Sequence, residues 1–263
     1  MAVIDVHAHI YPDKIAPKAV DAVGDFYNIE MYGKGSAMHL LAAKDRSPIT
    51  HFIVHSVATS PKAVESINDF IAEQCRLHPE FIGFMAMHQD YPEPEKEIER
   101  AIGMGLKGMK LHPDTQHVNM DDPRLMNIYE MIEGRLPVII HTGDYRYDYS
   151  HPRRLVQILR AFPDLVVDAA HFGCWSRYEV GYDVLHSENV FVDMSSAQLY
   201  LGQRRTCELT RMWGTDRVMF GSDYPMWDPA SEFRQFSTAG FSEDELENLL
   251  WHNAERFMGM TVS

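Results

Sequence analysis

Short apolar segments alternate with amphipathic segments along the whole chain, and this alternation limits the possible folds more than any other feature. Eight of the apolar segments have the length of a β-strand. Several of them, such as 52–54 and 138–140, consist only of Val, Ile or Phe, which is typical of strands with both faces covered. The predicted strands span residues 3–10, 50–58, 81–88, 108–112, 137–142, 165–171, 190–195 and 218–223.

The segments between these strands carry helix signals. Ser60 and Pro61, for example, form a cap residue followed by proline at the first helical position, and apolar residues then recur at helical intervals. The predicted helices span residues 61–78, 93–104, 123–134, 152–162, 178–187, 199–213 and 243–258. Eight strands alternating with helices fit one right-handed (β/α)8 TIM barrel of the α/β class, and we predict a single domain over residues 1–263. No Gly-x-Gly-x-x-Gly follows the first strand, which argues against a dinucleotide-binding sheet.

The first connection of the predicted barrel is much longer than the others. It spans residues 11–48 and contains Tyr32-Gly33-Lys34-Gly35 between two helical stretches. Long connections in compact domains are usually functional or disordered. We therefore expect a lid or rim over one end of the barrel, with a disordered surface loop as the alternative.

Composition excludes several classes of protein. The formal charge is -14, whereas nucleic-acid binding is driven by clustered Lys and Arg. No apolar run reaches the roughly 20 residues of a membrane span, and the chain enters its first strand without a secretion signal, so we expect a cytoplasmic protein. Cys75, Cys174 and Cys207 are too far apart for a Cys-x-x-Cys site, and their odd number argues against a disulfide framework. Cys174 lies close to His171, so a Cys–His nucleophile is one alternative there, beside a small buried side chain.

Polar residues at the ends of the predicted strands form a second pattern. His7 and His9 are two residues apart in the first strand, so their side chains point to the same face. In a β/α barrel the functional site lies at the carboxyl ends of the strands, and seven of the 14 histidines stand at such ends. The polar residues found there are His7, His9, His55, His88, Lys110, His112, His141, His171, Ser195 and Asp223.

This concentration of imidazole predicts a metal site. Zinc held by His and carboxylate groups takes three or four protein ligands, so His7 and His9 need another imidazole and a carboxylate. His141 is the best third nitrogen ligand. Asp223 is the best carboxylate, because an aspartate after a buried strand needs a cation to offset its desolvation. His171 either binds the metal or stands beside the metal-bound water.

Six short motifs carry a resemblance to a known family. They are IDVHAH at 4–9, GMKLHP at 108–113, IHTG at 140–143, AHFG at 170–173, FGSDYP at 220–225 and NAERF at 253–257. Together they resemble the amidohydrolase superfamily, and more narrowly its branch of aminocarboxymuconate-semialdehyde decarboxylase and related metal-dependent hydrolases. The resemblance covers the chain from residue 3 to about 258.

The resemblance implies one divalent metal, with zinc expected and manganese as the alternative. It implies that Asp223 also carries a proton during catalysis and that His171 is a second catalytic group, which orients water or stabilises negative charge. The implied metal ligands are His7, His9, His141 and Asp223.

The substrate contacts follow from the same resemblance. Lys110 is expected to contact a substrate carboxylate, since one metal is usual in this branch. In binuclear members a carboxylated lysine bridges two ions, so a second metal at Lys110 and His171 is the alternative. His112 is a further expected contact, and Arg146 and Arg177 are candidates for holding a substrate anion.

We therefore expect a metal-dependent hydrolase in which a metal-activated water attacks an amide, ester or lactone of a small, polar, anionic substrate. The alternative is a metal-dependent, non-oxidative decarboxylase of an unsaturated or aromatic acid. The chain is shorter than the decarboxylases of the branch and lacks a clear match to their arginine, which is why hydrolysis comes first. A non-catalytic metal protein is the third class, but structural zinc needs no additional base such as His171. A homodimer is expected at the family level.

Overall fold

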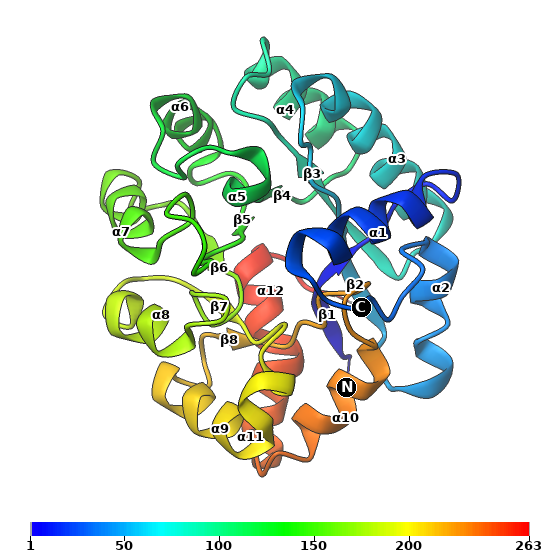
Figure 1. Ribbon diagram of the computed structural model, residues 1–263, viewed down its shortest axis with the longest axis vertical. Helices are drawn as coiled ribbons and strands as arrows, with labels where there is room; N and C mark the ends of the chain where they lie inside the picture. The colour runs from blue at the N-terminus through cyan, green and yellow to red at the C-terminus, as the bar shows by residue number, and fades with distance from the viewer. Residues whose placement is uncertain (1, 263) are drawn as a thin grey trace.

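The computed structural model describes residues 2–262. Within this range the chain forms eight strands in the predicted order, separated by helices (Figure 1). Strands β1 to β6 form one parallel sheet in sequence order, and β7 pairs in parallel with β8. The strands are β1 Ile4–His9, β2 His51–His55, β3 Phe81–Ala86, β4 Gly108–Leu111, β5 Val138–Ile140, β6 Val167–Ala169, β7 Val192–Asp193 and β8 Val218–Met219.

Backbone hydrogen bonds connect the two sheets at both seams. On one side Ala169 N donates to Phe191 O at 2.9 Å, and on the other Asp223 N donates to His7 O at 2.8 Å. An isolated parallel bridge lies next to each of these bonds. The chain is therefore an α/β protein whose parallel strands curl into a barrel, which confirms the predicted fold class.

The strands end earlier than predicted. β7 and β8 contain two residues each, although the predicted strands span 190–195 and 218–223. The reason is local backbone geometry, since Ser196 after β7 and Asp223 after β8 have φ angles of 56° and 59°, and His171 after β6 has one of 62°. Left-handed residues cannot continue a strand. The candidate site residues His171 and Asp223 therefore stand on turns that leave the sheet.

Each predicted helix is present, although several differ in their bounds. They are η2 Pro61–Ala63 with α3 Val64–Leu77, α4 Pro94–Gly103, α6 Pro123–Ile132, α7 Pro152–Ala161, α8 Tyr178–Leu185, α9 Gln198–Trp213, and α11 Glu243–Glu247 with η3 Asn248–His252 and α12 Asn253–Met258. Two further helices, α5 Pro113–Gln116 and α10 Pro229–Ser237, were not predicted. The Asp228 side chain accepts a hydrogen bond from Ala230 N and caps α10. Asp228 followed by Pro229 is therefore a helix-start signal that can be recognised in the sequence. Within residues 2–262, no helix is both long enough and apolar enough to cross a membrane.

The long first connection is ordered and covers one end of the barrel. It contains α1 Ala16–Tyr27, α2 Ala37–Leu41 and the short helix η1 Lys44–Arg46 (Figure 1). The Tyr27 hydroxyl at the end of α1 lies 2.7 Å from His112 Nε2, which follows β4. Side chains of α1 and of β1 line the same cavity. The connection is therefore a lid, as expected, and not a disordered loop.

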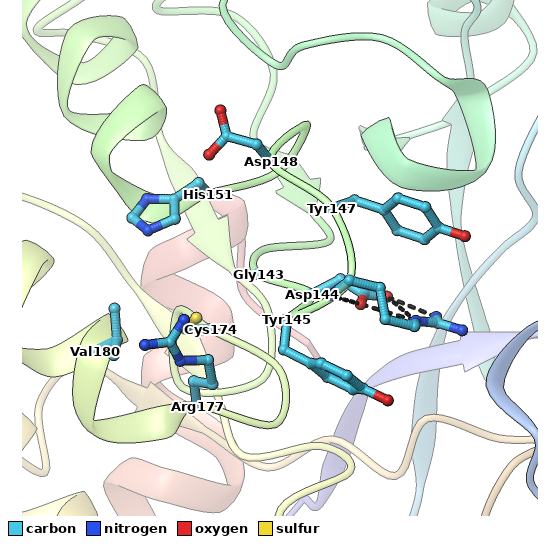
Figure 2. Close-up of a pocket in the computed structure, with 10 residues that line it drawn as sticks. Gly143, Asp144, Tyr145, Tyr147, Asp148, His151, Cys174, Arg177 and Val180 are labelled. Carbon is cyan, nitrogen blue, oxygen red and sulfur yellow. Dashed lines mark hydrogen bonds and ion pairs between the residues drawn. The ribbon is translucent and has the colours of Figure 1, made fainter.

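A separate, smaller hollow of about 340 Å³ lies beside the connection between β5 and α7 (Figure 2). Arg146 lines it and is held by Asp144, with 2.6 Å between Nη2 and Oδ2. Its guanidinium also lies 4.6 Å from the centre of the Phe26 ring of α1. Cys174 and Arg177 line the other side of this hollow.

The opposite end of the barrel is filled by apolar side chains. Ile4, Val6 and Phe84 point into the barrel and pack with Phe257 of α12, which closes that end. Figure 1 shows α12 in red behind the middle of the barrel. Because apolar side chains fill that end, we expect ligand chemistry at the carboxyl ends of the strands.

A tight helix–loop contact supports the turn that carries His171, and it yields a stability prediction. A methyl group at Gly181 of α8 would overlap the carbonyl oxygen of Phe172 and lie 2.8 Å from Gly173 C. We expect Gly181→Ala to lower the free energy of unfolding by about 1–3 kcal/mol, as overpacking does in cores. Urea unfolding would measure this.

Gly103→Ala provides the matched control for Gly181→Ala. Gly103 ends α4, and no described atom lies within 4 Å of its Cβ position. Its replacement should leave the free energy of unfolding unchanged or raise it by up to about 1 kcal/mol. Equal effects of the two substitutions would contradict the packing argument.

Candidate metal centre

The metal ligands predicted from the sequence, together with His112 and His171, line a single cavity at the carboxyl ends of the strands. The cavity has a volume of about 720 Å³ and lies under α1. Its polar end is formed by His7, His9, His112, His141, His171 and Asp223. These side chains are buried or nearly so, and they come from β1 and from the turns after β4, β5, β6 and β8.

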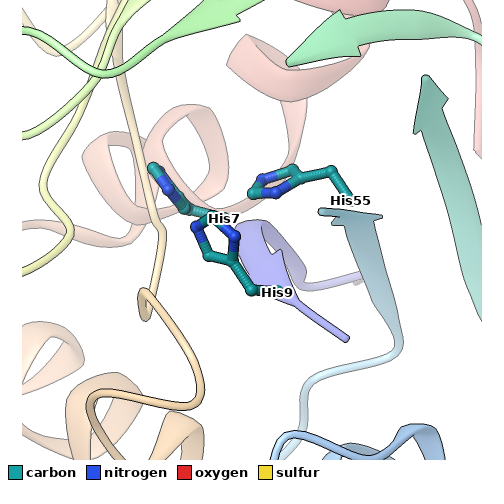
Figure 3. A group of neighbouring side chains, drawn as sticks. All are labelled: His7, His9 and His55. Atoms are coloured by element: carbon teal, nitrogen blue, oxygen red, sulfur yellow. The ribbon is translucent and has the colours of Figure 1, made fainter. Parts of the chain in front are cut away.

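One group of donor atoms gathers around the end of β1. His7 Nε2 and His9 Nε2 lie 3.6 Å and 3.7 Å from Asp223 Oδ1. His55, at the end of β2, packs against both rings with centroid distances of 5.0 Å and 4.4 Å (Figure 3). Both ring nitrogens of His55 are buried and have no hydrogen-bond partner within residues 2–262. His55, which the sequence placed only at a strand end, therefore offers a further nitrogen donor.

A second group surrounds His141. Its Nδ1 lies 3.0 Å from His171 Nε2, and its Nε2 lies 3.6 Å from Asp114 Oδ2. The ring also stacks on His112 at 3.9 Å between centroids. His171 links the two groups, because its ring centroid is 5.0 Å from His7 and 4.8 Å from His141.

The position of Asp223 is fixed by its backbone and by two side chains. Its left-handed φ of 59° is uncommon for a residue with a side chain, and such residues often cluster at functional sites. Ser196 Oγ donates a hydrogen bond to Asp223 Oδ2 at 2.5 Å, and Trp227 Nε1 donates to Ser196 Oγ at 2.8 Å. These two linked hydrogen bonds leave Asp223 Oδ1 facing His7 and His9. Nothing in the sequence pattern pointed to Ser196 or Trp227.

Burial sets the charge of the site. It lowers the pKa of His7 and of His171 to about 4, with Lys110 adding to the effect. It also lowers the pKa of His9 and His141 well below the usual range. The imidazoles are therefore neutral at pH 7, which is the form that binds metal ions. Burial raises the pKa of Asp223, and His171 and Ser196 offset part of that rise.

These donors fit a divalent metal. Ligands about 2.0–2.2 Å from a tetrahedral ion lie about 3.3–3.6 Å from one another, close to the spacing of His7, His9 and Asp223. His141 Nε2 is buried and, among the described residues, has no hydrogen-bond partner. A buried polar atom without a partner is costly, and a bound cation would relieve that cost. The structure therefore supports the donor chemistry predicted from the sequence.

Asp193 is a site residue that sequence reasoning missed. It is fully buried in β7, and its Oδ2 lies 2.7 Å from His7 Nδ1. Burial alone would raise the pKa of this carboxyl, but the His7 ring holds it well below its usual range. A carboxylate behind a metal-ligating histidine fixes the ring orientation and leaves Nε2 as the donor. The signal was an aspartate inside an apolar strand, the same pattern that identified Asp223.

We expect Asp193→Asn to weaken metal binding by about 10- to 100-fold, the usual effect of removing such a carboxylate. The amide keeps the shape of the side chain but removes the negative charge beside His7. Titration of the metal-free protein with Zn²⁺ or Mn²⁺ in an isothermal calorimeter would measure this. Unchanged affinity in a folded variant would show that Asp193 does not support the metal.

Lys110 lies beneath the cavity, and its side chain is not among those that line it. Its Nζ is 3.0 Å from His7 Nε2, and burial lowers the pKa of the ammonium group. This position places Lys110 at the candidate metal ligands, which fits a role at the ion more readily than contact with a substrate in the cavity.

The structure places the remaining predicted substrate contacts at two different hollows. His112 lines the cavity and accepts or donates a hydrogen bond with Tyr27. Arg146 and Arg177 are not brought to the cavity, because both line the smaller hollow of Figure 2. Burial raises the pKa of the Cys174 thiol to about 12, so a Cys174–His171 nucleophile gains no support.

Comparison with known proteins finds similar proteins both by sequence and among solved structures. One relative is 2-amino-3-carboxymuconate-6-semialdehyde decarboxylase of Dictyostelium discoideum, 25% identical over 237 residues that cover 74% of this chain and 66% of the relative. Among solved structures, a TIM-barrel protein of Bordetella bronchiseptica has a TM-score of 0.79 at 20% identity, covering 98% of this chain and 99% of that one. A 5-carboxyvanillate decarboxylase of Novosphingobium aromaticivorans, solved with manganese, has a TM-score of 0.75 at 17% identity, covering 98% and 96%.

The sequence pattern of the family described as Amidohydrolase matches residues 4–260. That match includes every candidate metal ligand, from His7 to Asp223. The structural neighbours share the barrel over nearly the whole chain. The chain belongs to the amidohydrolase family.

Proposed function

We propose that this protein is a metal-dependent, non-oxidative decarboxylase of an unsaturated or aromatic acid. Of the two reactions expected from the sequence, this one has more support from the comparisons, because the named relatives include decarboxylases. Hydrolysis of an amide, ester or lactone, the first expectation, remains the competing reaction.

The character of the cavity is the observation that carries the proposal. Apart from the histidines and Asp223 at one end, its lining is mainly apolar, and within residues 2–262 it includes no Lys, Arg or Glu. Decarboxylation turns a carboxylate anion into neutral carbon dioxide, so removal of the anion from water favours the reaction. A polar hydrolase substrate would instead leave its hydrogen-bonding groups against apolar walls.

The ion that fits this site is Zn²⁺ or Mn²⁺, held by His7, His9, His141 and Asp223, with His55 as a further nitrogen donor. When bound, the metal would supply positive charge that attracts the substrate carboxylate to this end of the cavity. The Novosphingobium relative was solved in complex with manganese.

Asp223 is placed to deliver the proton. Its pKa is raised by burial, and the Ser196 hydroxyl holds one carboxyl oxygen in a fixed position. The proton goes to the carbon that bears the carboxylate, and the carbon–carbon bond then breaks. Its electron pair restores the double bond or the aromatic ring, and carbon dioxide leaves.

His171 lines the same cavity as Asp223 and is placed to assist this step. Its Nδ1 donates to Ser195, with 2.8 Å to Oγ, and its Nε2 lies 3.0 Å from His141 Nδ1, so these two contacts fix the ring. The ring is neutral at pH 7, and we propose that Nε2 takes up a proton from water when the anionic substrate binds and then holds negative charge that develops on the substrate. His112 and Tyr27 form the neighbouring wall.

The test compares the two reactions on one preparation. The Mn²⁺-loaded protein is incubated in D₂O with unsaturated and aromatic acids labelled with carbon-13 in the carboxyl group, and separately with esters, lactones and amides. We expect labelled carbon dioxide, and deuterium at the carbon that lost it. Hydrolysis of the second panel without carbon dioxide from the first would contradict the proposal and restore the hydrolase.

A further inference from the structure

The cavity is much larger than a single-ring acid requires. An apolar cavity of about 150 Å³ is enough to bind one benzene ring, whereas this cavity has a volume of about 720 Å³. Its size is within the range of sites for larger ligands. A substrate that filled only the histidine end would leave most of the apolar lining in contact with water.

The far part of the cavity is formed by two helices that face each other, and each has a second apolar stripe. In the α1 region, Ala16 and Val20 are buried against the fold, whereas Ile15, Ala19 and Val23 line the cavity. Residues four apart lie on one face of a helix, so these three side chains form a continuous stripe. Ile15 is 50% exposed, so this stripe begins at the surface.

Helix α3 repeats the arrangement on the other side. Val64 and Ile71 are buried against the barrel, whereas Ala63, Ile67 and Phe70 line the cavity at positions three and four apart. The α1 stripe lies outside the hydrophobic core, whereas Ile67 and Phe70 of α3 are only partly buried and contact the core with one side while lining the cavity with the other. His9 and Asp223 line the same cavity.

We propose that this channel between α1 and α3 holds a long apolar substituent of the substrate, so that the substrate is an amphipathic acid. The inference rests on the proposed function for the position of the carboxylate, at the histidine end. An alkyl chain or a fused ring system on the acid would lie between Ile15, Val23 and Ile67. The small, polar substrate expected from the sequence does not match this lining.

The test uses binding, so that it does not depend on turnover. The Mn²⁺-loaded protein is titrated calorimetrically with benzoate, para-butylbenzoate and para-octylbenzoate. Each methylene buried in the channel should tighten the dissociation constant up to about fourfold. Similar dissociation constants for all three acids would overturn the inference and leave the decarboxylase proposal standing, whereas chain-length dependence without any carbon dioxide release would affect the proposed function alone.

Substitutions in the channel wall test where the apolar part of the acid binds. Ile67→Glu places a charge on the channel wall and should abolish the gain with chain length while benzoate still binds. Leu77→Glu is the matched control, because Leu77 ends the same helix, is 50% exposed and does not line the cavity. Ile67→Ala, which removes only part of the wall, serves if the charged variant does not fold, and it should weaken the longer acids alone. An unaltered chain-length effect in the folded Ile67 variants, or a change of oligomeric state with no change in binding, would place the apolar group elsewhere and overturn the inference.

Discussion

Asp223→Ala is expected to remove the bound metal and to lower turnover by about 10³-fold or more, because one residue supplies both a ligand and the proton. Asp223 Oδ1 is the atom that His7 Nε2 and His9 Nε2 both face. Without it, the candidate ligands that remain are the neutral imidazoles of His7, His9 and His141, which bring no negative charge to the ion. Metal content by mass spectrometry and carbon dioxide release would be measured on the same sample.

Two further variants make the result for Asp223 specific. Asp216→Ala removes an exposed aspartate just before β8 and should leave metal content and turnover unchanged. Asp223→Asn retains the shape and one oxygen, so it should keep more metal than the alanine variant yet remain inactive, since an amide cannot carry the proton. Full activity in either Asp223 variant would exclude the role assigned to this carboxyl group.

His171→Asn should keep the bound metal, unlike Asp223→Ala. It should lower turnover by about 10²- to 10⁴-fold, the range for loss of an acid–base or charge-stabilising group. We assign His171 to the substrate and not to the ion, because the expected ligand set of His7, His9, His141 and Asp223 is complete without it. Asparagine tolerates the left-handed backbone at this position, where φ is 62°. Measurements of kcat and metal content would separate the two roles.

His117→Asn is the matched control for His171→Asn. His117 also lines the cavity and also has a left-handed backbone, with φ of 53°, but it is exposed and lies away from Asp223. Its replacement should leave kcat nearly unchanged. Loss of one ion from His171→Asn would mean that His171 is a ligand, as in the two-metal alternative with Lys110.

Local patterns in the sequence were sufficient to predict the order of strands and helices in the barrel and the residues at the polar end of the cavity. Strand alternation placed His7 and His9 on one face, and the positions of His141, His171 and Asp223 after apolar strands brought them to the same cavity. These inferences depend on the period of the strand and on the topology of the barrel, which are encoded within short segments.

Contacts between distant segments could not be predicted in the same way. Tyr27 reaches His112 across 85 residues, and Ser196 reaches Asp223 across 27 residues, by contacts that no local pattern records. Arg146 is close to His141 in sequence, yet it lines the neighbouring hollow and not the cavity, so its expected contact with a substrate anion stays a prediction. Gly143, with φ of 76°, turns the chain there, and Asp144 then holds the guanidinium in the neighbouring hollow.

The size and apolarity of the cavity also emerged only from the structure. The stripe on α1 and the stripe on α3 are each readable as an amphipathic helix, but packing decides which apolar face is buried. The stripe of α1 that lines the cavity lies outside the hydrophobic core, and the stripe of α3 contacts both the core and the cavity. The small polar substrate expected from the sequence stays a prediction, and the acid with an apolar body is the proposal that competes with it.

The most direct test is to titrate the metal-free protein with Mn²⁺ while recording carbon dioxide release from an unsaturated or aromatic acid. The candidate ligands His7, His9 and Asp223, with His141 as the expected fourth, predict no release without metal and a linear rise that reaches its maximum at about one ion per chain. Release that is unaffected by removal of the metal, or that begins only after a second equivalent is bound, would contradict a single-metal decarboxylase.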